Sequence, residues 1–432
     1  MYAQVAVENV NCTFDKDYDY SIPQQLEGKA LVGRVAVPFG IGNRKRIGII
    51  TRLTDSTQGK RIKSISAVLD EAPLLSNEMM SLARWISEQT FCTYYEAVKA
   101  MLPVGINHKI IRSFCAVPGV DESIVASLDS DEKQVYDYLL SRSGYVKSEN
   151  FLKTLGFDVS SDIPERLLKV GLLAANDDAV RNIGDNNIRM VRLCEGSDDV
   201  SMTKKQSEVV NVLKDVGSVS VKELCYFTGY TPSVISALEK KSVVECFERE
   251  ELRSFVSRYA VQSAYDSGEI HLTDEQQKAY AGLLEDYKSG TGKTALLYGV
   301  TGSGKTSVYL KLIDAVLADN KTVIVMVPEI SLTPQTLSVF HSRYNDGVAV
   351  FHSALSAGER ADEWKRVKNG DAKIVIGTRS AVFAPLENIG LIIIDEEQEH
   401  TYKSEQTPRY NAKSVARYRA AWHKGLTLLA SA

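Results

Sequence analysis

The chain has 432 residues, of which 44% are hydrophobic and 25% are charged, fractions that are typical of a folded globular protein. The formal net charge of −4 excludes a strongly basic protein, so any binding of nucleic acid has to come from local clusters of charge. The sequence shows neither an export signal nor an apolar run long enough to span a membrane, which predicts a cytoplasmic protein without a membrane partner. Its length predicts roughly two to four domains.

Residues 1–110 consist mainly of short β-branched runs separated by turns, with one helical stretch at 77–102, which predicts a small β-rich domain. Between Lys29 and Lys63 there are nine Lys or Arg residues and one acid, Asp55. This excess of positive charge could form a surface that faces DNA phosphates. It could equally be a solvated face of exposed strands, and charge alone does not decide between the two.

Residues 111–255 are predicted to form a winged-helix region, possibly with two copies at 127–195 and 201–255. Each copy has a polar start, an amphipathic helix, a turn with glycine, a second helix ending in glycine and a third helix. The glycines Gly144 and Gly156 precede Gly217 and Gly229 by the same spacing. Winged helices bind either DNA or proteins, so the pattern leaves the ligand open, as well as which copy contacts DNA.

Residues 256–271 are predicted to be a linker. From 272 to 432, apolar strands alternate with helices, which predicts an α/β domain with a doubly wound parallel sheet. The whole chain is therefore expected to be a multidomain protein that combines α+β and α/β parts.

A nucleotide-binding motif, GVTGSGKT, lies between an apolar run at 295–298 and a predicted helix, and it matches G-x-x-x-x-G-K-[ST]. Its residues are Gly299, Val300, Thr301, Gly302, Ser303, Gly304, Lys305 and Thr306. The glycines let backbone N–H groups face a phosphate, and the start of the following helix adds partial positive charge. Lys305 can reach the terminal phosphates and Thr306 can bind Mg²⁺, so we expect a nucleoside triphosphate with Mg²⁺ here.

A second glycine-rich segment, 290–294, also contains G-x-G-K-T. Tyr287 occupies the place of the first glycine, and the segment precedes the apolar strand, so no helix begins after it. We interpret this segment, which includes Lys293, as a surface loop.

Acidic residues follow the buried strand predicted at 391–394. Asp395 is expected to hold Mg²⁺ through water, and Glu396 is expected to polarise the attacking water as a general base. Acids at the carboxyl end of a parallel strand lie where α/β sheets bind ligands. Two adjacent acids at this place favour a nucleotide hydrolase over a kinase.

Small and polar residues end two further predicted strands. Thr378 and Arg379 follow the strand at 374–376, and His352 and Ser353 follow another. Such residues suit contacts to the backbone and phosphates of a single DNA strand lying over the sheet.

Four segments after GVTGSGKT, in the order VPEISLTPQ, FHSALS, GTRSAVFAP and IIIDEEQEHTYKSEQTPRY, resemble the first motor lobe of the PriA family of bacterial replication-restart helicases, in superfamily 2. The residues 18–23, 37–40 and 46–48 resemble the domain with which that family binds the 3′ end of a DNA strand. The resemblance implies that 272–432 is a RecA-like first helicase lobe and that 1–110 is a 3′-end-binding domain.

The resemblance also implies roles for individual residues. A pocket for the DNA 3′ end would contain Tyr18, Asp19, Tyr20, Gly40 and Lys63. Rings can stack on a base, a carboxylate can accept from a 3′-hydroxyl, and a lysine can neutralise a phosphate. Alternation along a strand would equally place Tyr18 and Tyr20 together in a core.

In the motor lobe, Gln276 matches a glutamine that reads adenine through its amide, which makes ATP the expected nucleotide. The loop thought to couple single-stranded DNA to ATP hydrolysis contains Tyr402, Lys403, Arg409 and Tyr410. Gln398 and Pro408 depart from the family pattern, where a histidine and a bulky aromatic residue are usual, and this puts the coupling of DNA binding to ATP hydrolysis in question.

The function implied by the resemblance is that of an ATP-dependent 3′→5′ DNA helicase. It would recognise stalled or abandoned replication forks, unwind the lagging-strand duplex and direct primosome assembly for replication restart. Its implied partners are forked and single-stranded DNA, primosome proteins, single-stranded DNA-binding protein and the helicase-loading machinery, in the bacterial cytoplasm at the nucleoid.

The last residues, 428–432, resemble the opening of the next helicase motif. The family's second motor lobe and cysteine-rich zinc region are not found in these residues, so we expect a fragment of a longer protein, with zinc only in the missing C-terminal part. Such a fragment is expected to bind ATP weakly and to hydrolyse it poorly. The six cysteines of the chain form no C-x-x-C pair, so no zinc site is expected here.

Two other functions stay open. One is a DNA-structure sensor that loads partner proteins and uses ATP only as a switch, which the pair Asp395 and Glu396 disfavours. The other is a different superfamily 2 translocase, from which a preference for a 3′-hydroxyl end would distinguish this chain.

Overall fold

The structure is a computed structural model of the chain. It describes all residues except 12, 14, 31, 32, 41, 58, 60, 71, 107, 121, 182–186, 195–200 and 251–269. The predicted linker at 256–271 therefore lies almost entirely outside the described residues. The chain divides into two compact units, one comprising Met1–Asn182 with Val256–Ala432 and the other comprising Ile183–Phe255.

The N-terminal part of the first unit is a six-stranded sheet with the order β5-β2-β1-β4-β3-β6. Its strands are β1 (Tyr2–Val7), β2 (Tyr18–Ser21), β3 (Arg34–Phe39), β4 (Arg44–Thr54), β5 (Lys63–Ser64) and β6 (Ala67–Val68). Neighbouring strands are antiparallel except β2 and β5. The alternating β-branched residues form a core of their own, which includes Val5, Val35 and Ile50.

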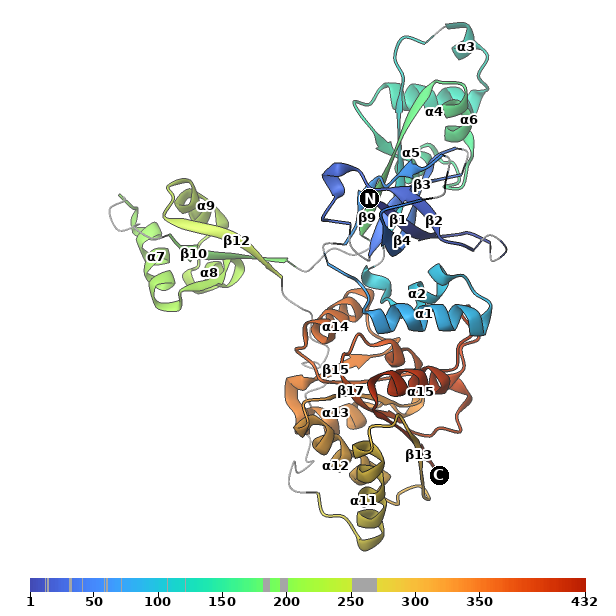
Figure 1. Cartoon of the computed structure of the whole chain (residues 1–432). Helices are drawn as coiled ribbons and strands as arrows, with labels where there is room; N and C mark the ends of the chain where they lie inside the picture. Colours follow the sequence, from blue (N-terminus) through green and yellow to red (C-terminus); the bar gives the residue numbers. More distant parts are fainter. Residues whose placement is uncertain are drawn as a thin grey trace. The chain divides into compact units, whose positions relative to one another are not determined.

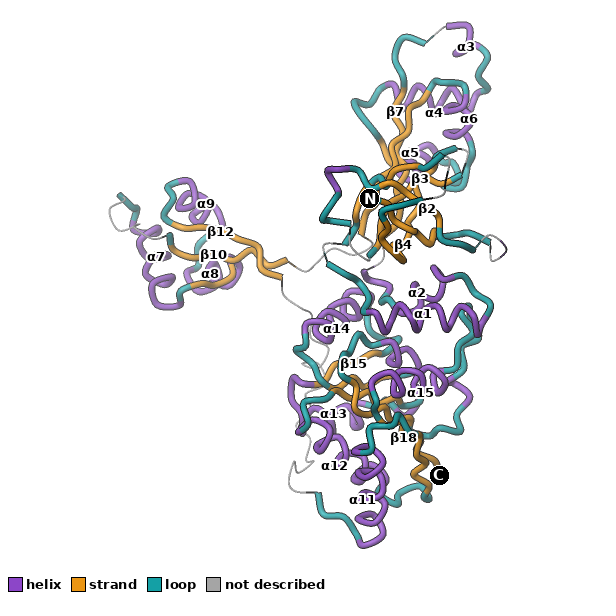
Figure 2. The backbone as a smooth tube through the Cα atoms, viewed as in Figure 1, coloured by secondary structure: helices purple, strands orange, loops and turns teal. Residues whose placement is uncertain are grey.

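The helical stretch predicted at 77–102 forms two helices, α1 (Asn77–Thr90) and α2 (Tyr94–Met101). Ser76 caps α1, and Thr93 with Glu96 forms a capping box on α2. The apolar faces of both helices pack outside the main core of the β-sheet domain, although Ala6 of β1 and Ile49 of β4 join their cluster. The two helices share one core with the parallel sheet of the C-terminal part, in which Leu82, Val98 and Phe383 are buried. Figure 2 shows α1 and α15, which contact each other, as neighbouring helices.

Two segments share one order of elements, with one additional short helix in the first. The first contains β7 (His108–Ala116), α3 (Glu122–Ala126), α4 (Ser130–Leu140), β8 (Val146–Lys147), α5 (Ser148–Leu155), α6 (Ile163–Lys169) and β9 (Leu173–Arg181). The second contains β10 (Asn187–Leu193), α7 (Lys204–Val216), β11 (Ser218–Ser220), α8 (Val221–Thr228), α9 (Pro232–Lys240) and β12 (Val244–Glu250). Their sheets have the corresponding orders β8-β7-β9 and β11-β10-β12. Each sheet includes a strand that precedes the helices, which the helix-based pattern did not reveal because strand pairing is non-local.

The C-terminal part of the first unit contains a parallel sheet with the order β13-β18-β17-β14-β16-β15. Its strands are β13 (Thr294–Tyr298), β14 (Thr322–Met326), β15 (Val348–Phe351), β16 (Ile374–Gly377), β17 (Ile389–Ile394) and β18 (Leu426–Ser431). Its helices are α11 (Asp274–Lys288), α12 (Lys305–Ala318), α13 (Pro334–Tyr344), α14 (Ala357–Asn369) and α15 (Ala412–His423). Figure 1 shows β13, β15 and β17 among the helices α11 to α15. Strands β16 and β17 are buried along their whole length, as expected for a parallel sheet covered by helices.

The predicted fold class is confirmed: a β-rich N-terminal domain is joined to a parallel α/β lobe in one chain. Among the described helices, none is both apolar enough and long enough to cross a lipid bilayer.

Candidate functional site

The phosphate-binding motif forms the loop between β13 and α12. Gly302 and Gly304 have φ angles of +81° and +78°, which only glycine adopts easily. A Cβ atom on Gly304 would also collide with Nε2 of Gln276. The Lys305 amine folds back over the loop and donates to the carbonyl oxygens of Gly299 at 2.5 Å and Val300 at 3.3 Å. The loop thus has the backbone conformation that its glycines require, with the lysine lying over it.

The predicted magnesium and general-base carboxylates follow β17. The Asp395 carboxylate accepts from the Glu396 backbone N–H at 3.0 Å, and the Glu396 carboxylate accepts from the Ser331 hydroxyl at 3.3 Å. Glu396 has a φ angle of +47°, a strained conformation for a residue with a side chain. Burial raises the pKa of Asp395, while the Glu396 N–H, Lys305 and Tyr309 lower it. The effect of burial is the largest, so the pKa lies above its ordinary value.

The two loops meet at the same edge of the sheet. Strands β13 and β17 flank β18, and all three are parallel, so the phosphate-binding loop and the acids both emerge at their carboxyl ends. The buried Tyr309 hydroxyl lies 3.1 Å from Thr306 Oγ1 and 3.4 Å from Asp395 Oδ2. Thr306 and Asp395, which are predicted to share one Mg²⁺, therefore both lie within hydrogen-bonding distance of the same hydroxyl group.

Tyr309 is a residue of this site that the sequence did not predict. Its only signal is its position three residues after Thr306, which places both on one face of α12. An aromatic residue at that position is expected to pack in the core, and Tyr309 is indeed buried. The sequence therefore did not predict that its hydroxyl group reaches Thr306 and Asp395.

The adenine contact of Gln276 stays a prediction, and in the structure its amide is bonded within the protein. Its Oε1 accepts from the Thr273 N–H at 3.0 Å, and its Nε2 donates to the Ser303 carbonyl at 2.9 Å. Both ends of the amide that the sequence assigns to adenine are thus occupied, by the cap of α11 and by the phosphate-binding loop. Threonine and glutamine at this spacing form a capping box, and that pattern was readable in the sequence.

The residues predicted to contact single-stranded DNA divide into two groups. Lys403 and Arg409 are exposed, and Arg379 is partly exposed, donating to the carbonyl oxygens of Thr401 at 3.1 Å and Lys403 at 2.5 Å. The Lys403 amine donates to the Arg409 carbonyl at 2.6 Å. Thr378, at the end of β16, is buried. The basic side chains therefore hold the 400–410 loop together and leave charge at the surface.

The two tyrosines of that loop are part of the core in this structure, and their DNA contacts stay a prediction. Tyr402 is 1% exposed, and its hydroxyl donates to the carbonyl oxygens of Asp395 at 2.6 Å and Met326 at 3.2 Å. Tyr410 is 8% exposed and packs edge-to-face on Phe383 with ring centroids 4.7 Å apart. Rings this deeply packed cannot stack on a DNA base in this conformation, but Tyr402 supports the backbone that carries Asp395.

Replacing Tyr402 with phenylalanine is expected to lower the free energy of unfolding by roughly 1–2 kcal/mol, because a buried carbonyl loses its donor. Affinity for single-stranded DNA should stay unchanged. Urea unfolding and oligonucleotide binding measure both effects, with Tyr298→Phe, an exposed ring, as the control. Unchanged stability together with weaker DNA binding would contradict this interpretation and restore the predicted DNA contact.

The residues predicted to bind a DNA 3′ end line one pocket of about 530 Å³ in the N-terminal domain. The predicted residues in its lining are Tyr18, Asp19, Tyr20, Gly40 and Lys63. The Asp19 carboxylate accepts from the Thr57 hydroxyl at 2.6 Å, and the Lys63 amine donates to the Gly40 carbonyl at 2.6 Å. Lys16, Phe39 and Arg61 also line the pocket and were not predicted.

The two tyrosines of this pocket differ. Tyr20 is 3% exposed, its hydroxyl donates to the Pro38 carbonyl at 3.1 Å, and burial raises its pKa to about 12. Its ring therefore belongs to the core in this structure, and its stacking on a DNA base stays a prediction. The Tyr18 ring is only partly buried and packs edge-to-face on Phe39, with centroids 5.0 Å apart. Tyr18 is the ring of the pair that a DNA base could reach.

The run of positive charge between Lys29 and Lys63 is partly neutralised by two ion pairs, one buried and one at the surface. Arg34 forms a buried ion pair with Asp70 at 2.6 Å, and Arg44 pairs with Glu165 at 2.8 Å. Both acids lie outside the stretch in which the sequence shows an excess of charge. Arg61 and Lys63 line the 3′-end pocket, whereas Lys60 lies outside the described residues. The positive surface is therefore smaller than the sequence suggests and includes the pocket.

Comparison with known families agrees with these two sites. Residues 4–103 match the family described as the 3′ DNA-binding domain (3′BD) of PriA, and residues 273–432 match the DEAD/DEAH box helicase family. The replication restart protein PriA of Bacillus subtilis (strain 168) is 35% identical over 440 residues, which cover 100% of this chain and 53% of that protein. The replication restart protein PriA of Synechocystis is 32% identical over 442 residues, which cover 96% of this chain and 50% of that protein.

The chain spans about half the length of the curated relatives it matches. A solved structure of RecG bound to a three-way DNA junction is 26% identical, covering 38% of this chain and 21% of that chain, with a TM-score of 0.29. Since the curated matches run along the chain and both family matches fall on the sites described above, this chain belongs to the PriA family of replication restart proteins.

Proposed function

We propose that this chain recognises DNA and binds ATP within a 3′→5′ helicase of replication restart. The helicase acts at stalled or abandoned forks, unwinds the lagging-strand duplex and directs primosome assembly. The observation that carries this proposal is the approach of Thr306 and Asp395 to one Tyr309 hydroxyl, at 3.1 Å and 3.4 Å. One Mg²⁺ can be shared only by side chains that lie this close together.

Four residues are proposed to do the work of the motor. Lys305 binds the terminal phosphates, Thr306 and Asp395 hold Mg²⁺, and Glu396 orients water and takes its proton. Bound Mg-ATP supplies the phosphoryl group whose transfer to water releases the free energy for movement. The glycines of the loop fit this role, since side chains on Gly302 and Gly304 would be strained by their positive φ angles.

The pocket in the N-terminal domain is proposed to hold the 3′ end of the leading strand. Asp19 would accept a hydrogen bond from the terminal 3′-hydroxyl, Tyr18 would stack on the last base, and Lys63 would neutralise a phosphate. Gly40 lets the chain turn at φ +69° beside the pocket. A phosphate in place of the hydroxyl would meet the negative charge of Asp19, which makes the site selective.

Division of labour among the domains follows from this. We assign recognition of the 3′ end to residues 1–110, contacts to the parental duplex to the winged-helix region at 111–255, and the motor to 272–432. Primosome proteins, single-stranded DNA-binding protein and the helicase-loading machinery are the proposed partners, at the nucleoid in the bacterial cytoplasm. The support for these partners is membership of the PriA family.

Recognition of the 3′ end can be tested by equilibrium binding to forks that differ only at the leading-strand terminus. The chain is expected to bind a fork with a 3′-hydroxyl about tenfold more tightly than one with a 3′-phosphate, a difference of one charge-assisted contact. Asp19→Ala should remove the preference by tightening binding to the 3′-phosphate fork.

Asp55→Ala is the matched control, since it removes one exposed carboxylate from the same domain outside the pocket. It should keep the preference. A wild-type chain that does not distinguish the two forks would favour a different superfamily 2 translocase.

A further inference from the structure

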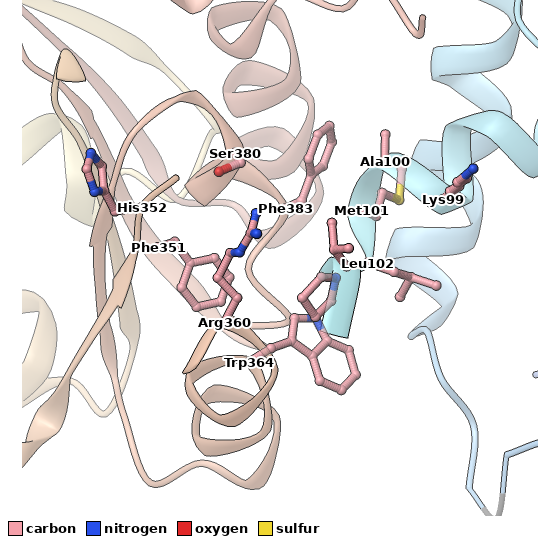
Figure 3. Close-up of a pocket in the computed structure, with 12 residues that line it drawn as sticks. Lys99, Ala100, Met101, Leu102, Phe351, His352, Arg360, Trp364, Ser380 and Phe383 are labelled. Carbon is pink, nitrogen blue, oxygen red and sulfur yellow. The ribbon is translucent and has the colours of Figure 1, made fainter. Parts of the chain in front are cut away.

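A second pocket, of about 260 Å³, lies where the N-terminal helices meet the motor lobe. One wall is formed by the end of α2 and the residues after it, including Met101 and Leu102. The opposite wall is formed by Phe351 at the end of β15, by Arg360 and Trp364 on α14 and by Phe383. Figure 3 shows Arg360 extending from α14 into the space between Phe351 and the α2 residues. No residue of this pocket has a role in the nucleotide site or in the 3′-end pocket.

The charged groups in the lining are all basic. Lys99 and Arg360 line the pocket together with His352, and no Asp or Glu is among its described lining residues. Arg360 Nε is buried without a hydrogen-bond partner among the described residues, and no ion pair involves this guanidinium within the described part of the chain. A buried donor without an acceptor is costly, and native proteins rarely leave one. An anionic ligand that accepts from Arg360 would remove this cost.

The remaining lining is apolar and aromatic. Phe351 contributes a partly exposed ring, and the more deeply buried Trp364, Phe383 and Met101 form the apolar wall around it. Flat apolar surfaces of this kind suit a nucleobase, because every base has a face that can stack on an aromatic ring. A phosphate beside a base matches an arginine beside aromatic rings.

The place of the pocket in the fold favours a DNA strand over a free nucleotide. Phe351 and His352 end β15, and Ser380 lies just after Thr378 and Arg379 at the end of β16. These are the strand ends from which contacts to a single strand are expected. ATP belongs at the carboxyl ends of β13 and β17, and β14 separates β17 from β16 in the sheet. A strand lying over β16 would therefore reach this pocket without entering the nucleotide site.

We propose that this pocket takes one unpaired nucleotide of single-stranded DNA, with the base against the partly exposed Phe351 and the phosphate on Arg360. The proposal rests on the proposed function, since it assumes that DNA crosses this edge of the sheet. It makes α2 a part of the DNA track of the motor as well as of the N-terminal domain.

The test measures binding of a single-stranded oligo(dT) to the chain without ATP, at several salt concentrations. Arg360→Ala is expected to weaken binding about tenfold and to lower the slope of log K against log salt by about 0.7, the value for one phosphate neutralised on a single strand. Arg360→Lys should keep the slope, because it keeps the charge. Neither variant removes a hydrogen bond formed by the described residues, so both should fold.

Lys373→Ala is the matched control. It removes one exposed positive charge from the same lobe, immediately before β16 begins and thus at the opposite edge of the sheet. Its affinity for oligo(dT) should stay within about twofold of the wild type, as for a charge that touches no phosphate. Equal losses of affinity in Arg360→Ala and Lys373→Ala would overturn the proposal.

Photo-crosslinking locates the base directly. An oligonucleotide with 5-iododeoxyuridine is expected to crosslink to Phe351, and Arg360→Ala should remove most of that crosslink. Crosslinks only elsewhere would overturn the pocket while leaving the helicase proposal standing, and a chain that binds no single strand at all would overturn both. If a short acidic peptide required Arg360 for binding and the oligonucleotide did not, the ligand would be a protein segment, and the proposal would be wrong.

Discussion

Replacing Lys305 with alanine is expected to weaken binding of Mg-ATP to this chain about 100-fold, because a charge-assisted hydrogen bond to a phosphate can no longer form. The Lys305 amine lies over the phosphate-binding loop, where it now donates to the carbonyl oxygens of Gly299 and Val300. A triphosphate would replace these neutral acceptors with charged ones. Titration calorimetry with Mg-ATP measures the change.

Lys293→Ala is the matched control for this variant. Lys293 belongs to the second G-x-G-K-T segment, and its exposed amine pairs with Asp286 at 2.7 Å. Its replacement should leave binding of Mg-ATP unchanged. An equal loss of affinity in both variants would mean that the general positive charge, rather than the loop, attracts the nucleotide.

Glu396→Gln tests the role of the same site in ATP hydrolysis. It should keep the affinity for Mg-ATP and lower the rate of DNA-stimulated hydrolysis by about 100- to 10,000-fold, the contribution of a general base. The strained φ angle of +47° at Glu396 is consistent with a position set by function. Unchanged hydrolysis in this variant would remove Glu396 from the mechanism.

Replacing Glu78 with alanine is expected to lower the free energy of unfolding of the first unit by roughly 3–5 kcal/mol, because a buried arginine loses its counter-charge. Glu78 begins α1 and Arg419 lies on α15, 341 positions later in the chain. Their side chains are 4% and 0% exposed and are joined by two hydrogen bonds, at 2.7 Å and 2.9 Å. Urea unfolding measures the decrease.

Arg419 does more than balance a charge. Its guanidinium also donates to the carbonyl oxygens of Val382 and Ala384 at 2.8 Å each and to that of Leu386 at 3.2 Å. These carbonyls follow the Thr378 and Arg379 segment along the chain. Removal of Glu78 should therefore disturb the packing between the N-terminal helices and the motor lobe. It should also lower the stability of the unit.

The pH dependence of stability gives an independent readout of this pair. Burial alone would raise the pKa of Glu78, but Arg419 and His423 lower it below its ordinary value of 4.5. A carboxylate with a lowered pKa contributes stability above its unfolded pKa and loses that contribution as the pH falls through its folded pKa. The wild type should therefore lose the stabilisation of this pair only in acid, and Glu78→Ala should lack that part of the acid transition.

The exposed pair Lys293–Asp286 is the control for the buried one. Its side chains are 51% and 34% exposed, so Lys293→Ala should cost less than about 1 kcal/mol. If Glu78→Ala cost no more than this surface variant, the ion pair would have no special role in joining the two parts of the unit.

The sequence by itself determined the parts of the site that consist of neighbouring residues. The phosphate-binding loop needs two glycines, a lysine and a threonine in one strand–loop–helix segment, and the acids after β17 need only an apolar run before them. Backbone conformation in such segments depends on nearby residues, so spacing was enough to find Lys305, Thr306, Asp395 and Glu396. The same reason explains why the β-rich and the parallel α/β parts were predicted as separate patterns.

Only the tertiary structure determined which side chains from distant segments contact each other and which become buried. Glu78 reads as an ordinary acid in the first turn of a helix, and only packing of α1 against α15 makes it the partner of Arg419. Tyr402 reads as a DNA contact, yet the fold turns its ring into the core beneath Asp395. The Arg360 Nε, which has no partner among the described residues, is buried at a pocket that α14 shares with the end of α2 and the residues after it. Burial and pairing between distant segments depend on how whole elements pack against each other. Local periodicity in the sequence does not predict this packing.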